Sequence, residues 1–285
     1  MSFDANAYRD SSVKGWEEAS AGWIRHQARM REWSAEISQA MIEAVAPQPG
    51  ERVLELAAGV GETGLLAAEL VAPVGSVVIS DQAEGMVEGA RARAEELGVR
   101  NAEFQVLNAE WIDLPLASVD IVLCRYGYML MADPGAALSE TRRVLRPGGR
   151  VGLAVWDALE ANPWASVPAA ALSDHGLAGG PGAGAGVPGP FALGDESRLR
   201  ELIAEAGFAE IEIAPVEVVR RHSDAADFWE LTLDLSRSFH DAVMSQRQDT
   251  IDAIRGDLIA QLEPFVATDG TLAVPTRTLV ARASA

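Results

Sequence analysis

The sequence predicts an α/β protein whose central sheet is mostly parallel and is covered by helices on both faces. Short apolar runs alternate with amphipathic segments of helix length between residues 52 and 156. This alternation is typical of crossover units, which build parallel sheets. With 285 residues, 48% of them hydrophobic, the chain is long enough to form one sizeable core. The predicted strands are 52–58, 76–80, 103–107, 119–124 and 151–156, and the helices between them are 63–71, 84–97 and 136–145.

The segment before this core, residues 1–48, is predicted to form a helical lid. Residues 10–46 are interpreted as two helices, because large apolar side chains recur at intervals of seven and three along one side: Trp16, Trp23, Met30 and Trp33. A stretch with two prolines and a glycine at 47–50 is expected to end the second helix. The tryptophans either anchor an ordinary amphipathic helix or close over a bound ligand.

The residues after the core segment 49–156 divide into an insertion and the remainder of the sheet. Residues 157–194 break the alternation and are interpreted as an insertion or lid loop. Its Gly- and Pro-rich stretch, 179–190, is either a tolerated surface insertion or a hinge beside a site. Residues 195–285 are expected to complete the core, with a helix at 196–206, a strand at 209–219, a helical insertion at about 224–263 and a strand at 272–282.

The charge and cysteine content of the chain exclude several classes of protein. With 42 acidic and 23 basic side chains, the formal net charge is -19, which disfavours a nucleic-acid partner. The single cysteine, Cys124, excludes an intrachain disulfide and makes a cytoplasmic location the expectation. We expect no metal site, since the four histidines show no ligand spacing. We also expect no membrane span, because no apolar stretch approaches about 20 residues.

A glycine-rich turn links the first predicted strand to its helix. Gly59, Gly61 and Gly64 satisfy the pattern G-x-G-x-x-G, which lets a ligand approach backbone N–H groups at the start of a helix. Asp81 follows about twenty residues later, at the end of the second strand, where a carboxylate can accept hydrogen bonds from ribose hydroxyls. These features fit NAD and S-adenosylmethionine equally well.

Glu55, at the end of the first predicted strand, favours one of these two ligands. A dinucleotide would place its pyrophosphate over the turn, where a nearby carboxylate would repel it. S-adenosylmethionine instead brings an ammonium and a sulfonium, for which the same carboxylate is favourable. The sequence therefore favours the sulfonium ligand.

Five motifs occur in the order and spacing of a known family: VLELAAGVGETG (53–64), VVISDQAEGM (77–86), NAEWIDLP (108–115), SVDIVLCRYGYMLMADP (118–134) and RRVLRPGGR (142–150). By these motifs the chain resembles class I S-adenosylmethionine-dependent methyltransferases of the ubiquinone/menaquinone-methyltransferase-like type. The resemblance covers about residues 15–156. It implies a Rossmann-like sheet of seven strands whose last strand is antiparallel, with a hairpin between 211–219 and 274–282.

The resemblance also implies S-adenosylmethionine as cofactor, S-adenosylhomocysteine as product, and a set of cofactor contacts. Glu55 and the turn backbone would face the methionine part, Asp81 the ribose, and Arg125 would present its carbonyl to the ammonium. The full set of matching positions is Glu55, Ala57, Gly59, Gly61, Asp81, Gln82, Met86, Asn108, Ala109, Glu110, Arg125 and Tyr126.

Two of these positions depart from the family pattern. Ala57 replaces the first glycine of the turn, a change that costs little if its φ is negative. Asn108 stands where aspartate is commoner, and its amide oxygen can still accept a hydrogen bond from the adenine amino group.

The expected partner is a small organic methyl acceptor, apolar or aromatic. Aromatic and thioether side chains would line its pocket: Trp111, Tyr126, Tyr128, Met129, Trp156, Trp164 and Phe191. If the reaction needs a general base, histidine supplies a pKa near neutrality, and His26 and His175 are the preferred candidates. The oligomeric state stays open, a homodimer being one option.

Three alternatives remain open at this level. An NAD(P)-dependent oxidoreductase would use the glycine turn but leaves Glu55 and the later motifs unexplained. A protein of the same fold that keeps the cofactor as a structural element would catalyse a cyclisation or isomerisation. A non-catalytic binding module would hold the cofactor without turnover.

Overall fold

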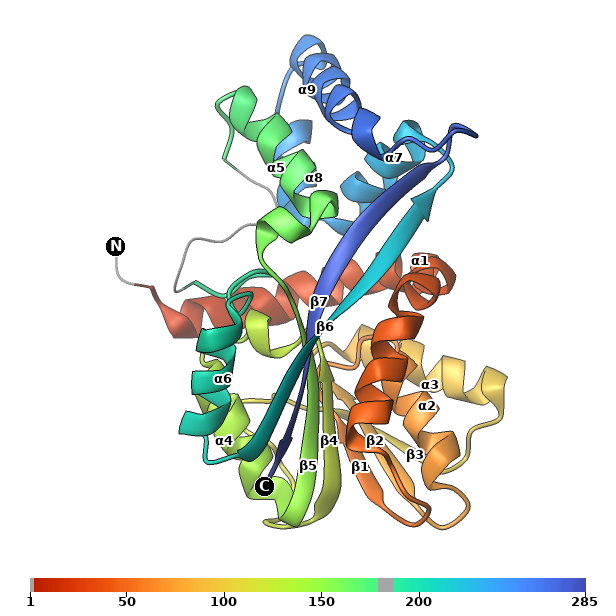
Figure 1. Ribbon diagram of the computed structural model, residues 1–285, viewed down its shortest axis with the longest axis vertical. Helices are drawn as coiled ribbons and strands as arrows, with labels where there is room; N and C mark the ends of the chain where they lie inside the picture. The colour runs from red at the N-terminus through yellow and green to blue at the C-terminus, as the bar shows by residue number, and fades with distance from the viewer. Residues whose placement is uncertain (1–2, 179–186) are drawn as a thin grey trace.

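The computed structural model describes residues 3–178 and 187–285, which form a seven-stranded sheet with helices on both faces (Figure 1). The order across the sheet is β3-β2-β1-β4-β5-β7-β6. Strands β1 to β5 pair in parallel, and β7 is antiparallel to both β5 and β6. The predicted sheet is confirmed, and its strands are β1 (Arg52–Glu55), β2 (Ser76–Asp81), β3 (Ala102–Val106), β4 (Val119–Arg125), β5 (Leu145–Trp156), β6 (Ala209–His222) and β7 (Leu272–Ser284).

Separate apolar cores cover the two faces of the sheet. On one face, Ile121 and Leu123 of β4 pack with residues of α1, α2 and α3. On the other face, Val122 and Cys124 of the same strand pack with residues of α4 and α6. Because successive residues of a strand point to opposite faces, a strand covered on both sides must be apolar throughout. The covering helices are α1 (Ala5–Val45), α2 (Glu62–Val71), α3 (Glu84–Leu97), α4 (Pro134–Val144) and α6 (Glu196–Glu205).

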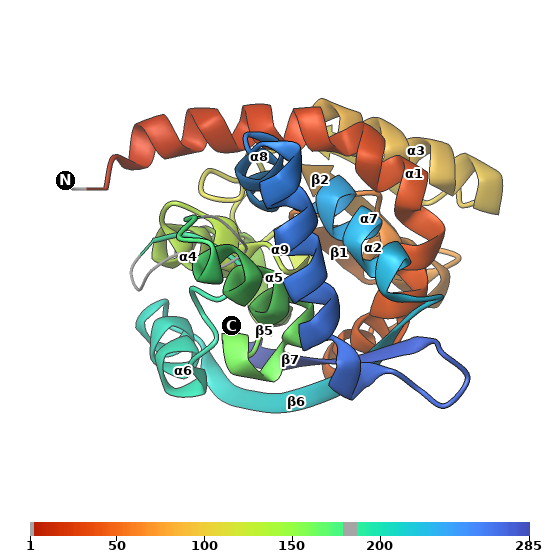
Figure 2. The ribbon, with the colours of Figure 1, turned by 90° about the horizontal axis from the view of Figure 1, so that it is seen from above.

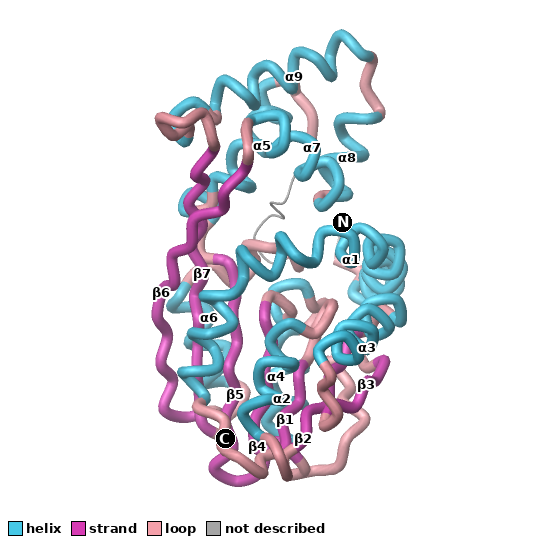
Figure 3. The backbone as a smooth tube through the Cα atoms, turned by 90° about the vertical axis from the view of Figure 1, so that its right-hand side faces the viewer, coloured by secondary structure: helices cyan, strands magenta, loops and turns pink. Residues whose placement is uncertain are grey.

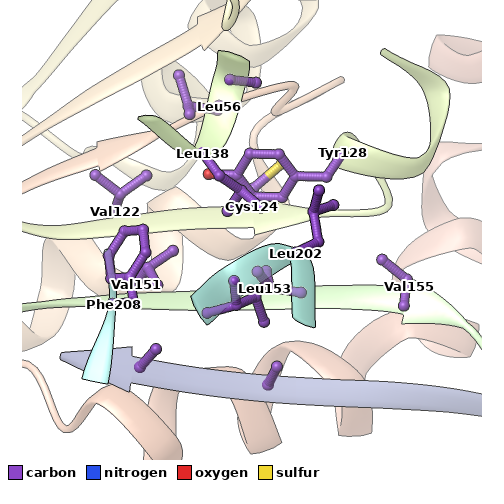
Figure 4. Packing of buried hydrophobic residues seen from close by; sticks show 14 of the residues in the cluster. Leu56, Val122, Cys124, Tyr128, Leu138, Val151, Leu153, Val155, Leu202 and Phe208 are labelled. Carbon is purple, nitrogen blue, oxygen red and sulfur yellow. The ribbon is translucent and has the colours of Figure 1, made fainter. Parts of the chain in front are cut away.

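Cys124 lies in the second of these cores. Its thiol is fully buried between β4 and the neighbouring helices, beside Tyr128 and Leu138 (Figure 4). Burial raises the pKa of the Cys124 thiol to about 12, so it stays protonated at neutral pH. A buried neutral thiol is a small apolar side chain, not a nucleophile.

The amino-terminal segment forms one helix where the sequence predicted two. Helix α1 is continuous from Ala5 to Val45 and bends, so that its first half crosses one end of the sheet and its second half runs along a face (Figures 1 and 2). Gly15 and Gly22 lie inside it without ending it, because glycine keeps the N–H that a helix requires, whereas proline does not. No described helix, α1 included, combines the length and apolarity of a membrane span.

A group of helices caps the far ends of β6 and β7 (Figures 1 and 3). They pack around Phe228 and Phe239 with Leu272 and Val274 of β7, in a core of their own. Residues 157–194, predicted to be a loop, supply one of these helices, and residues 179–186 lie outside the described part of the chain. The cap helices are α5 (Pro163–Asp174), α7 (Ala225–Leu235), α8 (Arg237–Met244) and α9 (Gln248–Gln261).

Candidate functional site

The candidate site lies where the order of parallel strands reverses. Strands β1 and β4 are neighbours in the sheet, yet the chain continues from them in opposite directions, to β2 and to β5. In open α/β sheets, ligands bind in the crevice at the carboxyl ends of such strands. The loops that follow β1, β2, β3 and β4 meet at this edge. The twelve residues that the sequence assigned to the cofactor lie at the carboxyl ends of these strands, in the loops after them or at the start of α3.

The glycine turn after β1 is held by the end of β2. The carboxylate of Asp81 accepts hydrogen bonds from the Gly59 amide at 2.9 Å and from the Ala83 amide at 3.0 Å. The Ala58 amide donates to the Ser80 carbonyl at 2.9 Å. Asp81 therefore fixes the starts of two helices at once, and its two acceptor oxygens retain lone pairs for a ligand.

Ala57 does not have the negative φ on which its low cost depended. Its φ is 50°, in the left-handed region, which costs about 1–2 kcal/mol for a residue with a Cβ. Gly127, after β4, explains how the Ala57 side chain fits: a Cβ on Gly127 would lie 2.7 Å from the Ala57 Cβ and 2.6 Å from Cys124 Sγ. The loops after β1 and β4 thus touch closely at a glycine.

Glu55 lies beneath the same turn with its side chain 1% exposed. Its Oε2 has no hydrogen-bond partner within 3.5 Å among the described residues. Burial raises the pKa of Glu55 to about 8, against the opposing effects of the Arg125 guanidinium and the Gly64 amide. Gly64 must be a glycine here, because a Cβ would collide with the Glu55 carboxyl. A buried carboxyl with one unpartnered oxygen can pair with a cationic group of a ligand.

Asn108 and Glu110 organise the loop after β3. The Asn108 side-chain oxygen accepts from the Glu110 amide at 2.8 Å. The Glu110 carboxyl group is buried, accepts from the Ala132 amide at 3.0 Å, and accepts from Arg9 Nε at 2.8 Å. Glu110, which the sequence grouped with the cofactor contacts, therefore ties α1 to the loops after β3 and β4.

The first half of α1 covers the loop after β2. Trp16 and Trp23 pack on Val60, Ala83 and Met86, in a small apolar cluster beside the glycine turn. Two polar contacts join the same surfaces: Glu17 accepts from the Gly85 amide at 3.2 Å, and Gln82 donates to Ser12 Oγ at 3.0 Å. Two of the predicted cofactor residues, Gln82 and Met86, are thus in direct contact with α1.

The two histidines predicted as candidate general bases, His26 and His175, lie on α1 and directly after α5. His26, on α1, contacts Asp234 of α7 at 2.9 Å, and His175, after α5, contacts Asp257 of α9 at 2.8 Å. Among the described residues, neither imidazole makes a hydrogen bond to the loops after β1 to β4, and their catalytic role stays a prediction. His222 is the histidine that the structure buries, between Trp33 and Phe228. Burial lowers the pKa of His222 to about 4, which keeps it neutral.

The described residues contain no group of three or more metal-ligating side chains.

Arg125 and Tyr126 follow one another at the end of β4. Arg125 donates from Nε to Thr63 at 3.2 Å, and Tyr126 has a φ of 63°. A residue with a side chain in the left-handed region is uncommon and is often found where a site fixes the backbone.

A family profile described as a methyltransferase domain matches residues 47–180, which span the glycine turn and the loops described above. This chain carries a class I S-adenosylmethionine-dependent methyltransferase domain. This domain assignment agrees with S-adenosylmethionine as the cofactor that the sequence motifs imply. The unpartnered Glu55 oxygen beneath the turn fits a ligand with an ammonium and a sulfonium.

Two curated relatives and one solved structure illustrate this similarity. The aklanonic acid methyltransferase DauC of Streptomyces sp. strain C5 is 31% identical over 146 residues, covering 51% of this chain and 65% of the relative. The demethylmenaquinone methyltransferase of Clavibacter sepedonicus is 42% identical over 114 residues, covering 39% and 44%. A putative methyltransferase from Bacillus halodurans shares the fold, with a TM-score of 0.54, 20% identity and coverage of 87% and 97%. The chain spans about half the length of the first curated relatives it matches.

The raised pKa of Glu55 predicts how the stability of the ligand-free methyltransferase domain depends on pH. The pKa is about 8 in the folded state against 4.5 as the ordinary value, so the folded state binds more protons between these limits. Stability contributed by this group therefore falls as pH rises from 4.5 to 8, by at most about 1.4 kcal/mol per pH unit. Glu55→Gln should remove this loss.

Urea unfolding of wild type and Glu55→Gln at several pH values measures the effect. The stability of the variant relative to wild type should grow steadily with pH. Glu88→Gln, at an exposed position of α3, is the matched control and should show no such trend. A constant difference between Glu55→Gln and wild type across this range would show that Glu55 is not buried as described.

The contact between Arg9 and Glu110 predicts how firmly α1 closes over the methyltransferase domain. Arg9→Ala leaves the buried Glu110 carboxyl without its cation, which should weaken binding of S-adenosylhomocysteine by about 1–3 kcal/mol. Hydrogen exchange of the first half of α1 should also become faster. Lys14→Ala, on the same helix but exposed, should change neither quantity. Unchanged hydrogen exchange in Arg9→Ala would show that the Arg9–Glu110 ion pair does not hold α1 in place.

Proposed function

We propose that this chain transfers a methyl group from S-adenosylmethionine to a small organic acceptor with apolar or aromatic character. The observation that carries the proposal is the buried carboxyl of Glu55, one oxygen of which has no partner, beneath a glycine turn at the switch point of the sheet. A cation placed at this point would restore the charge of the carboxylate, which burial alone suppresses.

Each residue would hold a different part of the cofactor. Glu55 would attract the cationic methionine portion, and Asp81 would accept hydrogen bonds from the ribose hydroxyls while it keeps the turn in place. Met86 would pack against the adenine, in the cluster that Trp16 and Trp23 close from α1. Asn108 would stand beside the adenine, its own amide oxygen already engaged by the Glu110 amide.

A row of aromatic rings leads away from the end of β4 and favours an apolar acceptor. Tyr126 stacks on Trp156 with ring centroids 4.1 Å apart and planes at 13°. Trp156 contacts Trp164, and Trp164 contacts Phe191, at centroid distances of 5.0 and 5.9 Å. These four of the predicted pocket residues form one continuous row of contacting rings, supplied by the core, by α5 and by the segment before α6.

The other three predicted pocket residues have different surroundings. Tyr128 and Met129 are buried in the sheet core, where the Tyr128 hydroxyl contacts Thr141 at 2.6 Å. Trp111 is 60% exposed and lies under the Arg9 guanidinium. These three predicted pocket residues therefore lie outside the row of contacting rings.

The bound cofactor supplies a methyl group that its sulfonium already activates for displacement. The task of this chain is then to bind the acceptor, orient it and keep water away. Helix α1 would cover the cofactor side, and α5 would cover the acceptor side through Trp164. The relatives named above are methyltransferases of aklanonic acid and demethylmenaquinone, which supports a small organic acceptor.

Incubation with methyl-labelled cofactor and a panel of aromatic acceptors tests the proposed activity. Label transferred to an acceptor supports the proposal. Conversion of an acceptor without label transfer would instead show a structural cofactor in a cyclase or isomerase. Calorimetry with S-adenosylhomocysteine and NAD in parallel identifies the ligand, because NAD binding alone would point to an oxidoreductase.

Substitution of Asp81 tests the cofactor site. Asp81→Ala removes an acceptor of ligand hydrogen bonds and frees the Gly59 amide, so affinity for S-adenosylhomocysteine should fall by about 1–3 kcal/mol. Asp113→Ala, exposed in a loop at the same edge of the sheet, is the control and should bind normally. Calorimetry measures both, and an unchanged affinity of Asp81→Ala would count against the assigned site.

A further inference from the structure

Arg220, on β6, lies within a cage of three tryptophans. Its guanidinium carbon is 4.8 Å from the ring centre of Trp164, 4.9 Å from that of Trp156 and 5.0 Å from that of Trp33. These rings come from α5, β5 and α1, so the cap, the sheet and the amino-terminal helix all meet at this arginine. Cation–π contacts stabilise a guanidinium, but they use none of its five N–H donors.

The cage provides no anion for this cation. In residues 3–178 and 187–285, the side chain of Arg220 makes neither a hydrogen bond nor an ion pair, and its Nε is buried without a partner. The neighbouring Arg29, which also lies over Trp33, is by contrast paired with Asp227 at 2.8 Å. A partly buried guanidinium with no counter-ion among the described residues can pair with an anionic group of a ligand.

The other charged groups near Arg220 add to the positive potential. Burial, together with the nearby Arg125 guanidinium, lowers the pKa of Arg220 to about 10, and the side chain is still a cation at neutral pH. His222, two residues along the same face of β6, is neutral, and Asp227 beside it is bound to Arg29. Neither His222 nor Asp227 therefore provides a counter-ion for Arg220.

The terminal nitrogens of Arg220 can reach a ligand. The residue is only partly buried, and among its side-chain nitrogens Nε alone is both buried and unpartnered. Its unused N–H groups thus border accessible space, next to the ring of Trp156 on which Tyr126 stacks. Two guanidinium groups therefore lie along this row of aromatic rings. Arg125, over Tyr126, donates a hydrogen bond to Thr63, whereas the side chain of Arg220, over Trp156 and Trp164, has no such partner among the described residues.

We propose that the methyl acceptor is a flat aromatic carboxylic acid whose carboxylate pairs with Arg220 while its rings pack among the surrounding indoles. The inference rests on the proposed function, which supplies the cofactor beside this row of rings. A guanidinium matches the two oxygens of a carboxylate with two parallel hydrogen bonds, and the neighbouring rings of Trp164 and Phe191 provide apolar contacts for a planar body. The carboxylate is an anchor in this account, whether the methyl group goes to it or to another atom.

Paired ligands that differ only in charge test the proposal. The protein, saturated with S-adenosylhomocysteine, is titrated with benzoate, 1-naphthoate and anthracene-2-carboxylate, each beside its neutral amide. Calorimetry gives affinities, and the fluorescence of the tryptophan cage gives an independent signal. At least one acid should bind about tenfold more tightly than its amide, because a charged bidentate pair is lost in the amide.

Two substitutions locate the preference. Arg220→Gln and Arg220→Met should both abolish the preference for acid over amide, and Met fills similar space without charge or donors. The matched control is Arg221→Gln, one residue along β6 at an exposed position, which should retain the preference. All three variants should bind S-adenosylhomocysteine as wild type does, which shows that they are folded.

The outcomes separate this inference from the proposed function. If wild type fails to bind S-adenosylhomocysteine, the proposed function is wrong and the inference falls with it. If it binds S-adenosylhomocysteine but prefers no acid to its amide in any pair, only the inference is wrong. Retention of an acid preference in Arg220→Met would also overturn it, since the anchor would then lie elsewhere.

Discussion

The burial of one carboxyl group, that of Glu55, sets the shape of the site. The group lies at the end of β1, directly under the turn into α2, and it leaves room there for a glycine alone at position 64. Burial keeps it protonated near neutral pH in the absence of a partner. A neutral acid that a cationic ligand group can ionise therefore lies at the point where the strand order reverses, which is where such sheets bind ligands.

The rest of the chain closes around this point from three directions. Asp81 fixes the turn from β2, Gly127 lets the loop after β4 approach it, and α1 crosses above with Arg9 bound to Glu110. The cap, carried on the long strands β6 and β7, brings Trp164 toward the same edge of the sheet. A core that binds the cofactor is thereby joined to covering elements that distinguish acceptors.

The sequence predicted the features that depend on neighbours along the chain. Apolar runs between glycine-rich turns predicted the parallel strands. The sequence also assigned Gly59 and Asp81 to one site, and a hydrogen bond joins these two residues in the structure. It failed where distant residues decide: α1 is one helix because Gly15 and Gly22 are tolerated inside it, and Ala57 has a positive φ. The cage around Arg220 joins residues from positions 33 to 220, and no local pattern indicates it.

The central claim, that Glu55 is a buried neutral acid which the ammonium group of the cofactor ionises, is tested most directly by counting protons. Calorimetry of S-adenosylhomocysteine binding at pH 6.5, in buffers of different ionisation enthalpy, gives the number of protons released per ligand. The account predicts release of about one proton by wild type, since the pKa of a buried acid falls when a cation is placed beside it, and none by Glu55→Gln. Equal release by the two proteins, or none by wild type, would contradict it.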